Sequence, residues 1–166
     1  MRLLWLSGIA TVALFCGIAW YLASLEPGAL ALQLAFTPRA FGAIVHVWSE
    51  AQLARYRAHL PFDFALIAAY ATFGYRLVTH SDVFVGCGHR LKRAAAWCLP
   101  LAGVCDGVEN LFHLWLTAAP RFGVPLAYAA SAACSLLKWL LIGGFGALVA
   151  ALLVLALLRG EAEKGG

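Results

Sequence analysis

The chain has 166 residues, the length of one ordinary domain. Hydrophobic residues make up 63% of it and charged residues 12%, whereas soluble domains average roughly 45–50% and roughly 25%. A soluble domain of this size cannot hide so much apolar surface, because a large fraction of its residues must face water. The same figures exclude a disordered chain, a collagen-like fibre and a disulfide-stapled secreted module. The composition predicts an integral membrane protein with a single membrane domain over residues 1–166.

Four stretches of the chain are predicted to span a membrane, because a span needs about 20 predominantly apolar residues. In chain order they are residues 3–25, 60–78, 94–119 and 124–158. The first is longer than the roughly 7–15 apolar residues of a signal peptide, so we expect a retained helix. The fourth is too long for one upright span and too short for two, so we expect one helix that tilts or projects. The predicted fold is an all-α, up-and-down bundle of four transmembrane helices.

Lysine and arginine residues are unevenly divided between the two ends of this bundle. With the N-terminus inside, the cytoplasmic side receives Arg2, Arg76, Arg90, Lys92, Arg93, Arg159 and Lys164, and the outer side receives Arg39, Arg55, Arg57 and Arg121. Because cytoplasmic loops carry the excess of these residues, both termini are predicted to be cytoplasmic. The net charge of +4 follows from this topology. Nucleic acid is not a predicted partner, since no basic stripe or stacking motif accompanies the charge.

The segment between the first two spans is predicted to carry an external amphipathic helix over residues 40–60. Its apolar residues fall on one helical face, and they are Phe41, Ile44, Val45, Trp48 and Tyr56. A helix of this kind lies on the surface of a membrane. The sequence leaves open whether it covers the bundle as a lid or only tethers the first span to the second. His46 and His59 are predicted to lie on its surface.

The third predicted span carries four polar residues on one face. Successive residues of a helix turn by about 100°, and all four fit within an arc of about 100°. They are Asp106, Glu109, Asn110 and His113. A charge in hydrocarbon costs at least about 2.5–3.5 kcal/mol, so such residues face protein or water and usually have a role. Two interpretations stay open, namely contacts that fix how the helices pack and a functional site.

The fourth predicted span contains one charged residue, Lys138. Counted from the outer ends of the two helices, Asp106 lies roughly 18 Å deep and Lys138 roughly 19 Å deep, at a rise of about 1.5 Å per residue. Because the two charges are level, they are predicted to form an ion pair. Glu109 is then left without an obvious counter-ion.

The second predicted span adds Asp63 and Tyr70, which lie seven residues apart and therefore on one face. Counted in the same way, Asp63 is predicted to be level with His113, and Tyr70 with Glu109. These residues would form a polar column that is open to the outer side. Asp63 and His113 are expected at its mouth, and the predicted ion pair at its base.

Three runs of the sequence resemble a group of small bacterial four-span membrane proteins of unassigned function. The runs are Leu60–Tyr70, Leu99–Asn110 and Ala132–Trp139, and they carry an Asp…Tyr pair, an Asp-x-x-Glu-Asn motif and a Lys-Trp pair on successive spans. The resemblance covers most of the chain and implies the fold and topology, but no activity. By architecture alone the chain is also similar to four-span sterol-isomerase-type proteins, whose pockets hold intramembrane acids, histidine and tryptophan. Function does not follow from such a likeness.

The predicted function is to bind or process a lipid or small apolar ligand in an intramembrane pocket. In this hypothesis Glu109 and His113 are the catalytic acid–base groups. Asp63, Tyr70 and Asn110 contact the ligand, and the Asp106–Lys138 pair is structural. The sequence does not decide whether the protein is an enzyme. The alternatives are a proton-coupled transporter or channel subunit, and a non-catalytic membrane assembly or accessory protein.

No metal or other cofactor is predicted. Glu109 and His113 have a ligand-like i, i+4 spacing, but only one helix supplies such a pair, whereas carboxylate metal sites in bundles draw on several helices. Cys87 and His89 are a lone pair in a connection between helices. The predicted partners are membrane lipids, the lipid or small apolar ligand, and further copies of the chain in a homo-oligomer.

Overall fold

The computed structural model describes residues 1–119 and 121–164, and these residues form an all-α protein, as predicted. The helices, in chain order, are α1 (Arg2–Leu22), α2 (Ala29–Gln33), α3 (Pro38–Val47), α4 (Glu50–His80), the 3-10 turn η1 (Asp82–Phe84), α5 (His89–Leu116) and α6 (Pro125–Lys164). Four of these helices are long, and each of the four predicted spans falls on one of them.

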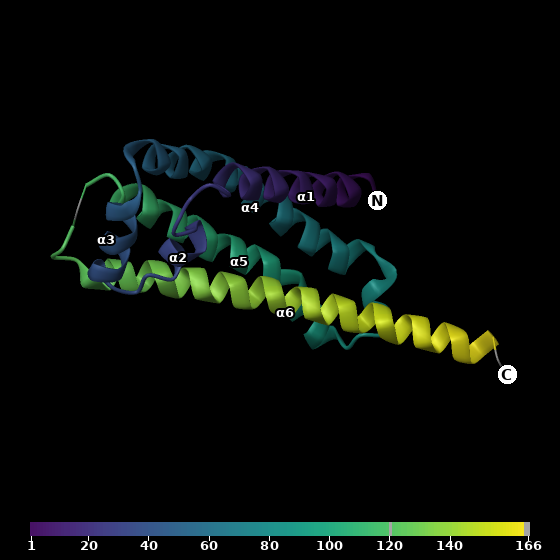
Figure 1. Cartoon of the computed structure of the whole chain (residues 1–166). Coiled ribbons are helices and arrows are strands. Elements are labelled where there is room, and N and C mark those ends of the chain that lie inside the picture. The colour runs from purple at the N-terminus through teal and green to yellow at the C-terminus, as the bar shows by residue number, and fades with distance from the viewer. Residues whose placement is uncertain (120, 165–166) are drawn as a thin grey trace.

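The four long helices run up and down, and each packs against the next one in the chain (Figure 1). Helix α1 packs along α4, α4 along α5, and α5 along α6. The N-terminus, η1 and the C-terminal part of α6 lie toward one end of the molecule, and α2 and α3 lie toward the other (Figure 1). Helix α6 has 40 residues and extends past the other helices, as predicted for the fourth stretch (Figure 1).

Two helices of the described chain are long and apolar enough to cross a membrane. They are α1, over Arg2–Leu22, and α6, over Pro125–Arg159. By this criterion the prediction of four spans is supported for two of them only. Helices α4 and α5 do not reach the criterion, because polar residues such as Asp63 and Arg76 in α4 and Asp106 and Glu109 in α5 lower their hydropathy.

The predicted amphipathic helix over residues 40–60 is wrong in its extent. Helix α3 ends at Val47, and the residues from Glu50 onward are the first turns of α4. The break has a local cause, since Ser49 and Gln52 form a reciprocal capping box that starts a new helix. The indole of Trp48 donates to the carbonyl of Pro27 at 2.9 Å, which fixes the chain at this break.

Helices α4 and α5 approach closely because glycines lie between them. A Cβ atom added to Gly74 would be 2.6 Å from Cδ1 of Leu99, and one added to Gly103 would be 3.1 Å from Cγ2 of Ile67. Small residues allow helices in an apolar environment to pack at such short distances. These two contacts set the register of α4 against α5, and the register decides which polar residues meet.

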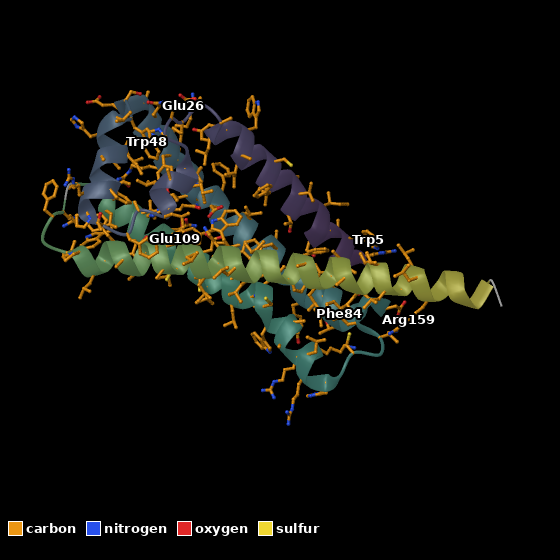
Figure 2. The ribbon with its side chains drawn as sticks, turned by 60° about the horizontal axis from the view of Figure 1, so that its bottom comes forward. Trp5, Glu26, Trp48, Phe84, Glu109 and Arg159 are labelled. Carbon is orange, nitrogen blue, oxygen red and sulfur yellow. The ribbon has the colours of Figure 1, made fainter. Side chains whose placement is uncertain are left out.

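The buried side chains form two apolar clusters at opposite ends of the bundle. One surrounds Phe84 and consists of Leu66, Tyr70, Val78, Phe84, Ala95, Ala96, Leu99, Ala102 and Phe145. The other surrounds Trp48 and consists of Leu25, Leu32, Ala35, Phe41, Trp48, Tyr56, Leu116 and Tyr128. Glu109 lies toward the end that carries Trp48, and Phe84 and Trp5 lie toward the opposite end (Figure 2). The polar residues of α5 therefore lie between the two clusters.

Candidate functional site

The polar face of α5 is directed into the bundle. Asp106, Glu109, Asn110 and His113 are each no more than 4% exposed, and Glu109 is completely buried. The outward face of the same helix between residues 94 and 115 is apolar, and its exposed members are Ala94, Trp97, Leu101, Val104, Val108, Leu111 and Trp115. This distribution is the reverse of that in a helix at the surface of a soluble protein, where charged residues point outward.

Lys138 of α6 lies between two carboxylates of α5. Its Nζ atom donates to Oδ1 of Asp106 at 2.8 Å and lies 2.6 Å from Oε2 of Glu109. The prediction that Glu109 has no counter-ion is wrong, because one turn of α5 separates the two carboxylates and a lysine side chain reaches both. The contact with Glu109 is an ion pair that is even shorter than the one with Asp106.

The predicted register between α4 and α5 is wrong by about one helical turn. Asn110, not His113, is level with Asp63, and its Nδ2 atom donates to Oδ2 of Asp63 at 2.7 Å. Tyr70 meets Asp106 and not Glu109. Its hydroxyl donates to Oδ2 of Asp106 at 3.0 Å. The prediction counted depth from the ends of the apolar runs, whereas the register follows from the packing of Gly74 and Gly103 described above.

His113 instead meets Tyr56, from the first turns of α4. The phenol oxygen and Nδ1 of His113 are hydrogen-bonded at 2.5 Å, and both residues are 1% exposed. The same Nδ1 atom is 3.8 Å from Oε1 of Glu109. Polar contacts therefore continue from Tyr56 through His113, Glu109, Lys138 and Asp106 to Tyr70, the whole series being buried.

A cavity of about 590 Å³ lies between α1 and α6, the two outer helices of the bundle. Its wall is polar at one end, where it contains His59, Asp63, Tyr70, Asp106 and Lys138. The other end is apolar, with Phe15, Ile18, Phe73, Leu77, Leu99, Phe145 and Val149. Its volume is within the roughly 300–1,000 Å³ of small-molecule sites.

The mouth of this cavity opens on the side of the bundle, between α1 and α6. Phe15 of α1 is 51% exposed and Trp139 of α6 is 38% exposed, and both line the cavity. Helix α2 lies along one edge of the mouth, where Oε1 of Gln33 accepts a hydrogen bond from the indole of Trp139 at 3.1 Å. A ligand that enters through this mouth approaches from the side of the bundle and not from one of its ends.

The predicted roles of the polar residues match their positions in the wall only in part, since Asp63 and Tyr70, the predicted ligand contacts, line the cavity. Glu109, His113 and Asn110 do not line the cavity, so the two predicted catalytic residues have no access to a ligand inside it. Asp106 and Lys138, which the sequence predicts to be only structural, do line it, together with Asp63 and Tyr70. Of the predicted site residues, those in contact with the cavity are therefore two of α4, one of α6 and one carboxylate of α5.

Sequence reasoning missed His59 and Gln33 as part of this wall. The sequence predicts His59 on the surface of the external helix, but it is 4% exposed, because it belongs to α4 and faces inward. It lies four residues before Asp63, so the face of Asp63 and Tyr70, extended backward, could have indicated it. Nothing in the sequence around Gln33 signals the short helix α2.

Within the described residues, no group of three or more histidine, cysteine or acidic residues is arranged to hold a metal ion. A wider hollow of about 1040 Å³ lies between α3 and the end of α5 with the residues that follow it, but its wall contains none of the predicted site residues. Comparison of the chain with protein-family models, curated proteins and solved structures gives no match. The resemblance to small four-span membrane proteins therefore stays a prediction.

Proposed function

We propose that the chain is an integral membrane protein with four spanning helices and that it binds an amphiphilic ligand in the cavity between α1 and α6. The observation that carries the proposal is the cavity itself, which has a charged end, an apolar end and a lateral mouth. A lipid or lipid-like molecule has the same division into a polar head and an apolar chain.

Helix α5 buries its polar face and exposes its apolar face, and this supports a membrane location for α4 and α5, which are not apolar along their whole length. The exposed stretch of α5 from Ala94 to Trp115 is about 30 Å long at about 1.5 Å per residue, which equals the hydrocarbon thickness of a bilayer of about 30 Å. The outward residues of α4 between 61 and 75 are likewise apolar or aromatic, with Phe62 63% exposed. Exposed apolar surface of this extent belongs against lipid or another protein.

The dimensions of the cavity also favour a chain-like ligand. Along α6 its wall runs from Lys138 to Val149, which is a distance of roughly 16 Å at about 1.5 Å per residue. The charged groups occupy only one end of this length. Because the mouth faces the side of the bundle, an amphiphile can pass from the bilayer into the cavity without moving its chain through water. The transfer therefore exposes little apolar surface to water.

The proposal is tested by photolabelling in detergent micelles with a long-chain alcohol that carries a diazirine near the end of its chain. We expect label on Phe73, Leu77 and Phe145 at the apolar end. Gly146 lines the cavity and has open space beside it, so Gly146→Trp should fill the cavity and abolish this labelling. Gly144 has the same open space but does not line the cavity, so Gly144→Trp is the matched control.

Labelling that is equal in the two tryptophan variants would overturn the proposed site. So would label confined to the outward residues of α5, such as Leu101 and Val104, because these report only contact with the micelle. Retention of the folded helix content in both variants, measured by circular dichroism, excludes misfolding as the reason for a loss.

We also propose that the membrane is a bacterial inner membrane, with both termini cytoplasmic. The basic cluster of Arg90, Lys92 and Arg93 at the start of α5 supports this orientation. Reporter fusions test it. A reporter that is active only in the cytoplasm should be active after Gly88 and inactive after Gly123, and the reverse result would invert the topology.

The proton-coupled alternative draws support from the buried series of contacts between Tyr56 and Tyr70. Toward the opposite end of the bundle, however, this series is followed by the cluster around Phe84, whose buried members other than Tyr70 are all apolar. A proton flux in liposomes that Glu109→Gln abolishes would favour a transporter or channel subunit. A purely structural role, as in an accessory protein, predicts that neither flux nor labelling of the cavity is found.

A further inference from the structure

We infer that the ligand of the cavity carries a cationic amine as its head group, and that amphiphiles with anionic heads are rejected. The inference rests on the proposed function and adds the chemical class of the ligand. It follows from the net charge of the side chains at the polar end of the cavity, which is negative.

Two carboxylates, those of Asp63 and Asp106, and the ammonium group of Lys138 line this end. A third carboxylate, that of Glu109, contacts the same ammonium group from inside the bundle. Lys138 contacts Asp106 and Glu109 together, so one of these two negative charges has no positive partner of its own. Asp63 receives only a hydrogen bond from the neutral amide of Asn110. Among the described residues, no lysine, arginine or histidine lies within the 4.0 Å of an ion pair with Asp63.

The uncompensated carboxylate is in contact with the cavity. Asp63 and Asp106 both line it, and Oδ1 of Asp63 has no hydrogen-bond partner in the described chain. Excess negative charge away from water is costly unless an opposite charge or donor meets it. A protonated amine supplies a positive charge and several N–H donors at once, and its hydrogen bonds to carboxylates are of the strong, charge-assisted kind.

An anionic head would meet the opposite conditions. A phosphate or carboxylate has no donor when ionised and would stand against Asp63 and Asp106. The one positive group of the wall, Lys138, is already held by two carboxylates at 2.8 and 2.6 Å. A neutral hydroxyl head can donate one hydrogen bond but brings no charge. We therefore expect its affinity for the cavity to lie between those of an amine head and an anionic head.

Three probes with the same chain and different heads test the inference, namely dodecylamine, dodecanol and dodecyl phosphate. Each competes with the diazirine alcohol for labelling of the cavity in nonionic micelles. We expect dodecylamine to compete at a concentration at least about tenfold lower than dodecanol, since a tenfold difference is about 1.4 kcal/mol, the size of one charge-assisted contact. Dodecyl phosphate should not compete below the concentrations at which it disturbs the micelle.

Asp63→Asn tests the residue that carries the preference. The substitution keeps the shape of the side chain and removes its charge, so the advantage of the amine over the alcohol should shrink to less than about threefold. Asp82→Asn removes a carboxylate of η1, at the other end of the bundle, and should leave the ratio unchanged.

The outcomes separate this inference from the proposed function. If no probe competes for the cavity, the proposed function fails. If all three compete equally, or the phosphate competes best, the cavity binds amphiphiles and only the inferred head group is wrong. If the ratio is present in the native protein and unchanged in Asp63→Asn, the selectivity has another origin and Asp63 does not determine it.

Discussion

Glu109 and Lys138 approach to 2.6 Å in the centre of the bundle, and the same lysine is held by Asp106 at 2.8 Å. One positive charge therefore joins two negative charges on successive turns of α5. Because all three groups are almost completely buried, the stability of the bundle depends on which of them is removed.

We predict that Lys138→Met destabilises the protein much more than Glu109→Gln does. Loss of the lysine leaves two buried carboxylates facing each other, and removal of one partner from a buried pair typically costs about 3–5 kcal/mol. Glu109→Gln leaves a matched Asp106–Lys138 pair, so its cost should stay within about 1.5 kcal/mol, the size of an ordinary hydrogen bond. Denaturant unfolding in detergent measures both free energies. Equal costs would mean that Glu109 is an essential partner of the lysine and not an excess charge.

We predict that Tyr56→Phe lowers stability without changing ligand binding. The variant leaves Nδ1 of the buried His113 without its hydrogen-bond partner, which should cost about 1–3 kcal/mol. Neither Tyr56 nor His113 lines the cavity, so photolabelling at Phe73 should be unaffected. Tyr70→Phe is the comparison, because Tyr70 does line the cavity and bonds Asp106. A loss of labelling in Tyr56→Phe would contradict this prediction and would support the role of His113 as an acid–base group at the ligand, which the sequence predicts.

The sequence predicts the parts of this site that depend on one helix at a time. Helical periodicity alone places Asp106, Glu109, Asn110 and His113 on one face of α5, and that face is buried. Counting depth along two helices brings Asp106 level with Lys138, whose atoms are in contact in the structure. Both inferences use only the rise and turn of an α-helix, which tertiary packing hardly changes.

The sequence does not predict the features that depend on how helices slide against each other. The close approach at Gly74 and Leu99 moves α4 by about a turn relative to the estimate, and this exchanges the partners of Asp63, Tyr70 and His113. The sequence does not predict the cavity either. Its wall joins residues of five helices, and no periodicity within α1 or α2 marks their contribution.

We predict that the stability of the protein falls as the pH drops below about 7.5 because of His59, which precedes the second predicted span. Burial lowers the pKa of His59 below its ordinary value in the folded protein. The unfolded chain therefore binds a proton near pH 6.5 that the folded chain does not, and acid favours unfolding. His59→Gln should flatten this dependence, and His46→Gln, at an exposed position, should not. An unchanged slope in His59→Gln would contradict the prediction.

We predict that Gly74→Ala destabilises the bundle by about 1–3 kcal/mol, the usual cost of extra atoms in a packed core. The added Cβ would lie 2.6 Å from Cδ1 and 2.8 Å from Cβ of Leu99, so α4 and α5 must move apart. Gly146→Ala meets open space and should stabilise α6 by up to about 1 kcal/mol through helix propensity alone. The two are compared by denaturant unfolding in the same detergent.

The double variant Gly74→Ala/Leu99→Ala shows whether the clash is the cause. Leu99→Ala alone opens a void and should cost about 2–5 kcal/mol, but in the double variant it also makes room for the new methyl group. We expect the double variant to be more stable than the sum of the single costs by about 0.5–3 kcal/mol, which is the range of coupling between residues in contact. Additive costs would show that the register of α4 and α5 does not depend on this contact, and the polar partners across the two helices would then have to be fixed by their own hydrogen bonds.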